Sequence, residues 1–175
     1  IINHQSLIAT KAARVCYAAR GDGIMEFGLR RAQGPDAGIY GARAAVIGGC
    51  AGTSNVLTGQ MFNVPVLGTH AHSWIMSFPD EYTAFKTYAK MYPNSCTLLV
   101  DTYDVLKSGV PNAIRVFEEM REEGIKLTHY GIRIDSGDLA YLSKEAYKML
   151  AAAGFDDATI SASSDLDEYL IDSLK

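Results

Sequence analysis

Residues 129–164 read HYGIRIDSGDLAYLSKEAYKMLAAAGFDDATISASS, and this stretch decides the fold class. Two short apolar runs, 129–134 and 158–162, have the length and composition of strands, and the segment between them, 139–153, has apolar residues at helical spacing. A strand, a helix and a second strand in this order form a parallel unit with a right-handed crossover. The stretch therefore predicts an α/β fold.

The same alternation of strands and helices continues towards the N-terminus. The other predicted elements are strands at 64–67 and 97–100, helices at 79–91 and 111–122, and amphipathic helical stretches at 8–19 and 166–174. No linker composition divides the sequence, so we expect one continuous unit over residues 1–175. Because the chain starts with Ile1 inside a helical pattern, we expect it to be a piece of a longer protein.

Polar side chains follow the predicted strands at their carboxyl ends. Asp101 and Asp135 each end a strand and lie 34 positions apart, which is one strand-helix period; His70 and His72 follow the strand before them. Parallel α/β folds build active sites at this edge, so the sequence predicts an enzyme. No GxGxxG or P-loop motif follows a strand, which favours a partial barrel over an open nucleotide-binding sheet.

Composition excludes several classes of function. A net charge of −4 speaks against a nucleic-acid partner, and no apolar run approaches the roughly 20 residues of a membrane span. Cys16, Cys50 and Cys96 are widely spaced and form no CxxC motif, which speaks against a disulfide framework or a zinc site. We expect a cytoplasmic protein that binds neither membrane nor nucleic acid.

Two alternatives stay open for each polar group at the strand ends. Arg133 and Asp135 share one face of a strand and suit a polar or anionic ligand, or else a structural ion pair. His70 and His72 lack a carboxylate or thiol at metal-ligand spacing, so we expect no metal site. The sharper hypothesis is one catalytic histidine oriented by Asp101; the competing interpretation is that either histidine merely packs or faces solvent. Asp138 is best interpreted as a helix N-cap.

An aromatic residue beside cations forms a further candidate site. Phe27 lies close to Arg30, and a phenyl face can stack on a flat heteroaromatic ring while a guanidinium binds a carboxylate or phosphate. A buried phenylalanine with solvated arginines is the competing interpretation.

Five stretches, in order, resemble the nicotinate phosphoribosyltransferase family. They are EFGLRRAQG at 26–34, GTSN at 52–55, GTHAHSW at 68–74, VDTYD at 100–104 and GIRIDSGDL at 131–139. The resemblance implies a partial, irregular TIM-like α/β barrel with parallel strand-helix units, of which this chain would be the central portion. It also implies transfer of a phosphoribosyl group from phosphoribosyl pyrophosphate to nicotinate in NAD biosynthesis, with ATP and Mg²⁺, by a homodimer in full-length form. We expect the 175-residue piece alone to have little or no turnover.

The resemblance also implies roles for individual residues. His72 would be the histidine that ATP phosphorylates, Asp101 would hold its ring, and Asp135 would stabilise charge along the ribose. The residues implied to bind substrate are Phe27 (stacking on the pyridine ring), Arg30 and Arg133 (meeting anionic ends), Ser54, Gly68, Thr69 and Ser73.

Ser54 helps to choose the substrate. The related nicotinamide-using branch has an Asp where this sequence has Ser54, and an Asp repels a carboxylate, so Ser54 favours nicotinate. The alternatives are a type II phosphoribosyltransferase that uses nicotinamide or another pyridine, a different barrel enzyme such as an aldolase, and a catalytically silent ligand-binding module. An aldolase is disfavoured because no predicted strand ends in Lys.

Overall fold

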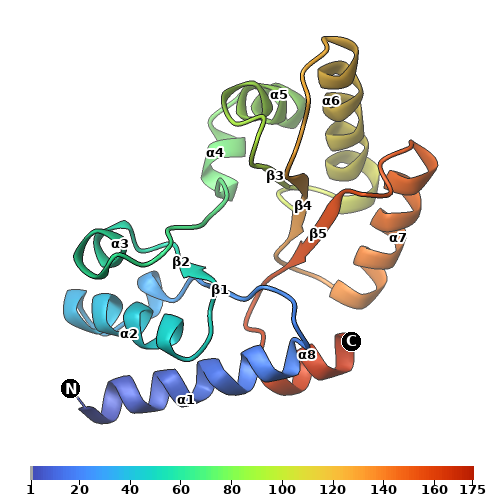
Figure 1. The fold of residues 1–175 in the computed structure, drawn as a ribbon. Coiled ribbons are helices and arrows are strands. Elements are labelled where there is room, and N and C mark those ends of the chain that lie inside the picture. Colours follow the sequence, from blue (N-terminus) through green and yellow to red (C-terminus); the bar gives the residue numbers. More distant parts are fainter. Residues whose placement is uncertain (1) are drawn as a thin grey trace. The chain divides into compact units, whose positions relative to one another are not determined.

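A computed structural model of the protein describes residues 2–175, and these residues form two compact units. The first unit contains the chain up to Gly68 together with Leu166–Lys175, and the second contains Thr69–Asp165. The sequence predicted one continuous unit because no linker is visible in its composition. The division arises because helix α8 (Glu168–Leu174) returns to pack on helix α1 (Ile2–Ala18), as Figure 1 shows. This long-range contact has no signature in the local sequence.

The second unit is built on a three-stranded parallel sheet. Its strands are β3 (Cys96–Leu99), β4 (Tyr130–Ile134) and β5 (Thr159–Ala162), in the order β3-β4-β5. All three strands were predicted, and their parallel pairing confirms the α/β fold class. Within residues 2–175 the sheet is not closed, so the barrel stays a prediction.

Three helices pack side by side around these strands (Figure 1). They are α5 (Glu81–Met91), α6 (Val110–Glu122) and α7 (Leu139–Ala152), each within two residues of its predicted bounds. In α6, Val116 and Phe117 are completely buried against the sheet. Leu98 and Ile132, at the centres of β3 and β4, are also completely buried, as expected for parallel strands that are covered by helices.

The connection from β3 to α6 is a π-helical turn, Val105–Gly109, that the sequence did not predict. Asp104 caps it by accepting hydrogen bonds from the backbone N–H groups of Leu106 (3.1 Å) and Lys107 (2.8 Å). A Cβ at Gly109 would lie 1.9 Å from the carbonyl oxygen of Val100. The turn therefore presses against the carboxyl end of β3, directly before Asp101.

We expect Gly109→Ala to destabilise the second unit, because the added methyl would collide with backbone that has no flexible end to move aside. Overpacking of this kind costs about 1–3 kcal/mol in the free energy of unfolding. Chemical denaturation measures the loss. Gly23→Ala is the control, since nothing lies within 4 Å of a Cβ there; equal stability of the two variants would contradict the prediction.

The first unit packs helix α2 (Pro35–Ile47) on α1. It also contains a pair of two-residue parallel strands, β1 (Met25–Glu26) and β2 (Gly52–Thr53), and helix α3 (Val56–Phe62). Gly48, directly after α2, allows a close approach of the chains, since a Cβ there would lie 2.5 Å from the carbonyl oxygen of Ala9.

The strand predicted at 64–67 is wrong. Only Val66 pairs, through an isolated parallel bridge to Thr53. Pro65 accepts a hydrogen bond from the Thr53 N–H (3.0 Å) but has no N–H of its own, and the neighbouring β2 has only two residues to pair with. An apolar run therefore remains an extended connection here.

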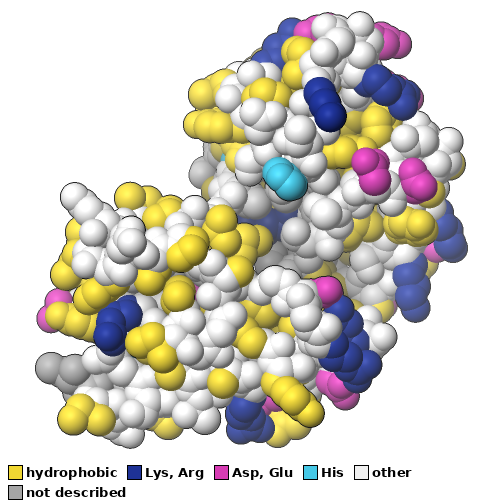
Figure 2. Space-filling model, in the orientation of Figure 1, with side chains coloured by type: hydrophobic (Ala, Val, Ile, Leu, Met, Phe, Trp, Pro, Cys, Tyr) yellow, Lys and Arg dark blue, Asp and Glu magenta, His cyan; other side chains and the backbone are white. Residues whose placement is uncertain are grey.

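Charged side chains of both signs are interspersed over the face drawn in Figure 2. Among residues 2–175, no helix combines the length and the apolar character that crossing a membrane requires.

Candidate active site

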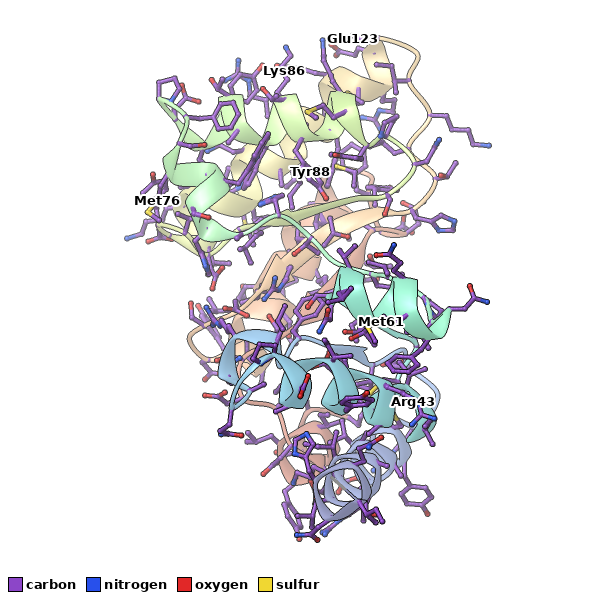
Figure 3. All side chains as sticks on the ribbon, turned by 90° about the vertical axis from the view of Figure 1, so that its left-hand side faces the viewer. Arg43, Met61, Met76, Lys86, Tyr88 and Glu123 are labelled. Carbon is purple, nitrogen blue, oxygen red and sulfur yellow. The ribbon has the colours of Figure 1, made fainter. Side chains whose placement is uncertain are left out.

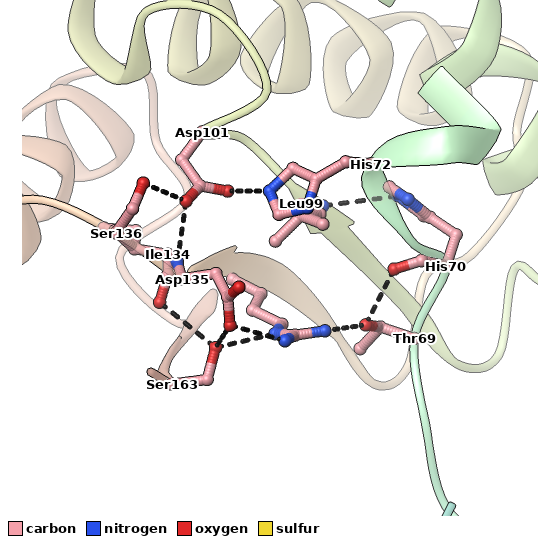
Figure 4. Close-up of polar contacts among 10 residues, drawn as sticks. Thr69, His70, His72, Leu99, Asp101, Ile134, Asp135, Ser136 and Ser163 are labelled. Atoms are coloured by element: carbon pink, nitrogen blue, oxygen red, sulfur yellow. Dashed lines mark hydrogen bonds and ion pairs between the residues drawn. The ribbon is translucent and has the colours of Figure 1, made fainter. Parts of the chain in front are cut away.

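The carboxyl ends of the three parallel strands carry the candidate site of the second unit. Asp101 comes two residues after β3, while Asp135 and Ser163 come directly after β4 and β5. His72 is the first residue of the short helix α4 (His72–Met76), which precedes α5. Figure 4 shows that these side chains belong to one hydrogen-bonded cluster.

The contact between His72 and Asp101 defines the centre of the cluster. Nε2 of His72 lies 3.0 Å from Oδ1 of Asp101, and the Asp101 side chain is 1% exposed whereas that of His72 is 39% exposed. A carboxylate only accepts hydrogen bonds, so Nε2 is the donor in this contact, and in the neutral ring Nδ1 keeps a lone pair. The geometry thus provides an accessible imidazole with one nucleophilic nitrogen.

Asp101 is itself held from a second strand. Its Oδ2 accepts hydrogen bonds from the Asp135 backbone N–H (3.0 Å) and from the Ser136 hydroxyl (2.6 Å). The sequence predicted no role in the site for Ser136. Its position directly after Asp135, at a strand end, is the signal that could have identified it.

Arg133 and Asp135 form an ion pair of 2.7 Å, and Arg133 also donates to Ser163 (2.8 Å) and Thr69 (2.9 Å). Burial raises the pKa of Asp135, but hydrogen bonds from Ser163 and Arg133 outweigh it, and the pKa lies below its usual range. Asp135 is therefore ionised at neutral pH. The ion pair that the sequence left as an alternative is present, and the ligand-binding role of Arg133 stays a prediction.

His70 is 8% exposed and thus far less accessible than His72. Its Nε2 accepts a hydrogen bond from the Leu99 N–H (3.2 Å). Burial lowers the pKa of His70 to about 4, so its ring is neutral at physiological pH. Among residues 2–175 there is no group of three or more His, Cys, Asp or Glu side chains that could hold a metal ion.

The remaining predicted substrate-binding residues lie mainly in the first unit. Phe27 and Ser54 come directly after the paired strands β1 and β2, and so leave the pair at the same end. The Ser54 N–H donates to the Glu26 carbonyl oxygen (3.0 Å). Arg30 is exposed in a 3₁₀ turn, Leu29–Arg31.

The Glu26 carboxylate fixes the backbone around these residues. It accepts hydrogen bonds from the Gly28 N–H and from the Thr53 hydroxyl (2.6 Å), and so ties together the two segments that carry Phe27 and Ser54. Nothing in the sequence analysis indicated this function of Glu26.

Gly68 and Ser73 are both exposed, Gly68 at the end of the first unit and Ser73 in α4. Neither is among the residues that line two surface hollows, one of about 1090 Å³ beside α1 and α8 and one of about 690 Å³ beside α7 and β5. The histidine and the aspartates at the strand ends do not line these hollows either.

Fold and site together define an α/β protein with a polar cluster at the carboxyl ends of parallel strands. The model of the nicotinate phosphoribosyltransferase (NAPRTase) family matches residues 23–162. The chain is 57% identical, over its whole length, to a nicotinate phosphoribosyltransferase of Bacillus subtilis, and 32% identical over 96% of its length to the Homo sapiens protein of that name. It belongs to the nicotinate phosphoribosyltransferase family.

Solved structures agree with this assignment. The crystal structure of human nicotinic acid phosphoribosyltransferase matches 98% of the chain with a TM-score of 0.87 and 32% identity, and the chain covers 45% of that structure. The nicotinate-nucleotide pyrophosphorylase of Pyrococcus furiosus matches 97% of the chain with a TM-score of 0.83 and 28% identity; 43% of that structure is covered. The chain spans 35% of the Bacillus relative and 41% of the human one.

Proposed function

We propose that the full-length protein transfers a phosphoribosyl group from phosphoribosyl pyrophosphate to nicotinate, forming nicotinate mononucleotide and pyrophosphate for NAD biosynthesis. Membership of the family supports this reaction. The observation that carries it is the cluster in which His72, Asp101 and Asp135 are joined by hydrogen bonds. We further propose that this chain is the central portion of an irregular α/β barrel in a longer, cytoplasmic, homodimeric protein.

His72 accepts a phosphoryl group from ATP in this proposal. The Nδ1 lone pair attacks the γ-phosphorus, the bond from that phosphorus to the bridging oxygen breaks, and ADP leaves; water later takes the phosphoryl group to give phosphate. Asp101 keeps the proton on Nε2 through the 3.0 Å contact and stabilises positive charge on the ring. The added phosphoryl charge then changes the electrostatics around the neighbouring strand ends.

Asp135 acts on the sugar. As pyrophosphate leaves C1 of the ribose, positive charge develops there before the pyridine nitrogen forms the new bond, and an ionised carboxylate stabilises that charge. The hydrogen bonds from Ser163 (2.5 Å) and Arg133 (2.7 Å) support this role, because they hold the Asp135 carboxylate in its ionised form.

The other residues carry the substrates. Phe27 stacks on the pyridine ring, and Arg30 and Arg133 meet anionic groups. Gly68, Thr69 and Ser73, which lie close to His72 in the sequence, also contribute to substrate binding. We propose that Mg²⁺ enters bound to the phosphates of ATP and phosphoribosyl pyrophosphate, since the described residues include no group of three or more His, Cys, Asp or Glu side chains that could hold it.

Ser54→Asp is expected to weaken nicotinate binding, because a second carboxylate would face that of the substrate. We expect the KM for nicotinate to rise about 10-fold or more, while the KM for nicotinamide changes less. Steady-state kinetics with both substrates measure the ratio. Ser54→Asn is the control, because the Asn side chain is nearly the same size as that of Asp but carries no charge. An equal effect of the two variants would contradict the hypothesis that charge at this position selects nicotinate over nicotinamide.

The reaction is tested by incubating the full-length protein with nicotinate, phosphoribosyl pyrophosphate, Mg²⁺ and ATP. Nicotinate mononucleotide and pyrophosphate are expected in equal amounts. Binding of both substrates in a calorimeter with no product formed would instead indicate a catalytically silent ligand-binding module.

A further inference from the structure

His70 and His72 contact the same strand in matching steps. The Leu99 N–H donates to Nε2 of His70, and the Asp101 carboxylate meets Nε2 of His72. In both contacts the two residues are 29 positions apart in the sequence. Moving two residues along the chain from His70 to His72 therefore moves the contact two residues along the other segment, from Leu99 to Asp101. Figure 4 shows the two contacts beside each other. This equal offset is the register of a parallel strand pair, made here by side chains.

At the edge of β3, the backbone N–H of Leu99 needs a side chain as its hydrogen-bond partner. The Val100 N–H donates to the Arg133 carbonyl oxygen on β4, and the N–H of the preceding residue, Leu99, points the opposite way. A buried backbone N–H without a partner is costly. The imidazole of His70 accepts from this N–H, which no backbone carbonyl among residues 2–175 reaches.

The surroundings of His70 fix its ring. The ring of Tyr88 meets it edge-on at 4.6 Å between centroids, and the ring of Phe85 lies 6.1 Å away. Figure 3 shows Tyr88 on the side of α5 that faces the strands, whereas Lys86 points outward. A neutral, packed ring keeps the Nε2 lone pair aimed at Leu99. The proton of the imidazole is then on Nδ1, which is buried and has no hydrogen-bond partner among the described residues. The two histidines therefore have opposite tautomers.

We propose that His70 is a positioning residue: it locks the segment before α4 to the edge of β3, and so places the imidazole of His72 against Asp101. His70 touches neither substrate nor phosphoryl group in this assignment. The effect on phosphorylation of His72 rests on the proposed function. The contact between His70 and the Leu99 N–H does not, because it is present in the structure whatever reaction the protein catalyses.

Two measurements on the full-length protein test the proposal. Hydrogen–deuterium exchange reports on the Leu99 N–H, and mass spectrometry after ATP treatment reports on phosphohistidine at position 72. His70→Phe keeps an aromatic ring beside Tyr88 but removes the acceptor. We expect faster exchange at the Leu99 N–H and about 10-fold less phosphohistidine. A factor of about 10 in the population of the correctly placed segment corresponds to the cost of leaving one buried donor unsatisfied.

His70→Gln is the rescue variant, since its amide oxygen reaches the place of the imidazole Nε2. It is expected to restore both readouts, whereas His70→Asn, one methylene shorter, is not; the Asn variant also replaces the Phe variant if the latter fails to fold. His129→Phe, at an exposed position, is the control for loss of a histidine.

Unchanged exchange at Leu99 in His70→Phe would overturn the proposal, and so would faster exchange with undiminished phosphohistidine. An equal loss of phosphohistidine in the Gln and Asn variants would also overturn the proposal. It would show that the effect does not depend on an acceptor placed to meet the Leu99 N–H. If the wild-type protein takes no phosphate from ATP, the proposed function fails, while exchange at Leu99 still decides whether His70 holds the segment.

Discussion

His72→Ala is expected to abolish the stimulation of nicotinate mononucleotide formation by ATP in the full-length protein, while some basal transfer remains. The variant lacks Nδ1, the nitrogen that we propose accepts the phosphoryl group, but keeps Asp135 and the groups that hold it. Product formation with and without ATP measures the effect, and phosphohistidine should disappear in parallel.

The control for this variant is His129→Ala, since His129 is exposed and its backbone carbonyl, unaffected by the change, accepts from Cys96. ATP stimulation should survive there in full. If it also survived in His72→Ala, another residue would be the site of phosphorylation and the assignment of His72 would be wrong.

Asp135→Asn is expected to lower phosphoribosyl transfer about 10²–10³-fold, both with and without ATP, because the neutral amide no longer stabilises the cationic sugar. Phosphorylation of His72 should be affected far less, since the bond to Asp101 comes from the backbone N–H of residue 135 and not from its side chain. Single-turnover rates of transfer, alongside the yield of phosphohistidine, separate the two steps.

Asp138→Asn is the matched control, the same chemical change three positions away. Asp138 caps α7 by accepting from the Tyr141 N–H (3.0 Å), as predicted, and Asn is an equally good N-cap. Its transfer rate should equal that of the wild type. Equal losses in the two variants would show that the effect comes from the folding of this loop and not from charge at the ribose.

The pairing of the two central aspartates follows from the sequence for a simple reason. In β3 and β4 the paired residues, such as Leu99 and Arg133, are 34 positions apart, and so are Asp101 and Asp135. A single strand-helix period therefore places both aspartates at one edge, and apolar runs of the right length suffice to predict it.

Other features depend on contacts that no local pattern encodes. The π-helical turn Val105–Gly109 has no hydrophobic period of its own, and the return of α8 to α1 is a contact between opposite ends of the chain. The hydrogen bond from the Asp135 N–H to Asp101 needs the twist and register of two strands. The sequence predicts which side chains share an edge, but not which atoms meet.

The hydrogen bond from the Asp135 N–H to Asp101 joins the two groups to which we assign the two parts of the proposed reaction. One oxygen of Asp101 contacts the ring of His72, and the other contacts the backbone of Asp135 and the hydroxyl of Ser136. If His72 gains and loses a phosphoryl group as proposed, the Asp101 carboxylate connects any displacement of the imidazole directly to the loop that carries Asp135. In the proposed mechanism, one nearly inaccessible side chain would thus couple the phosphorylation of His72 to the carboxylate that acts on the sugar.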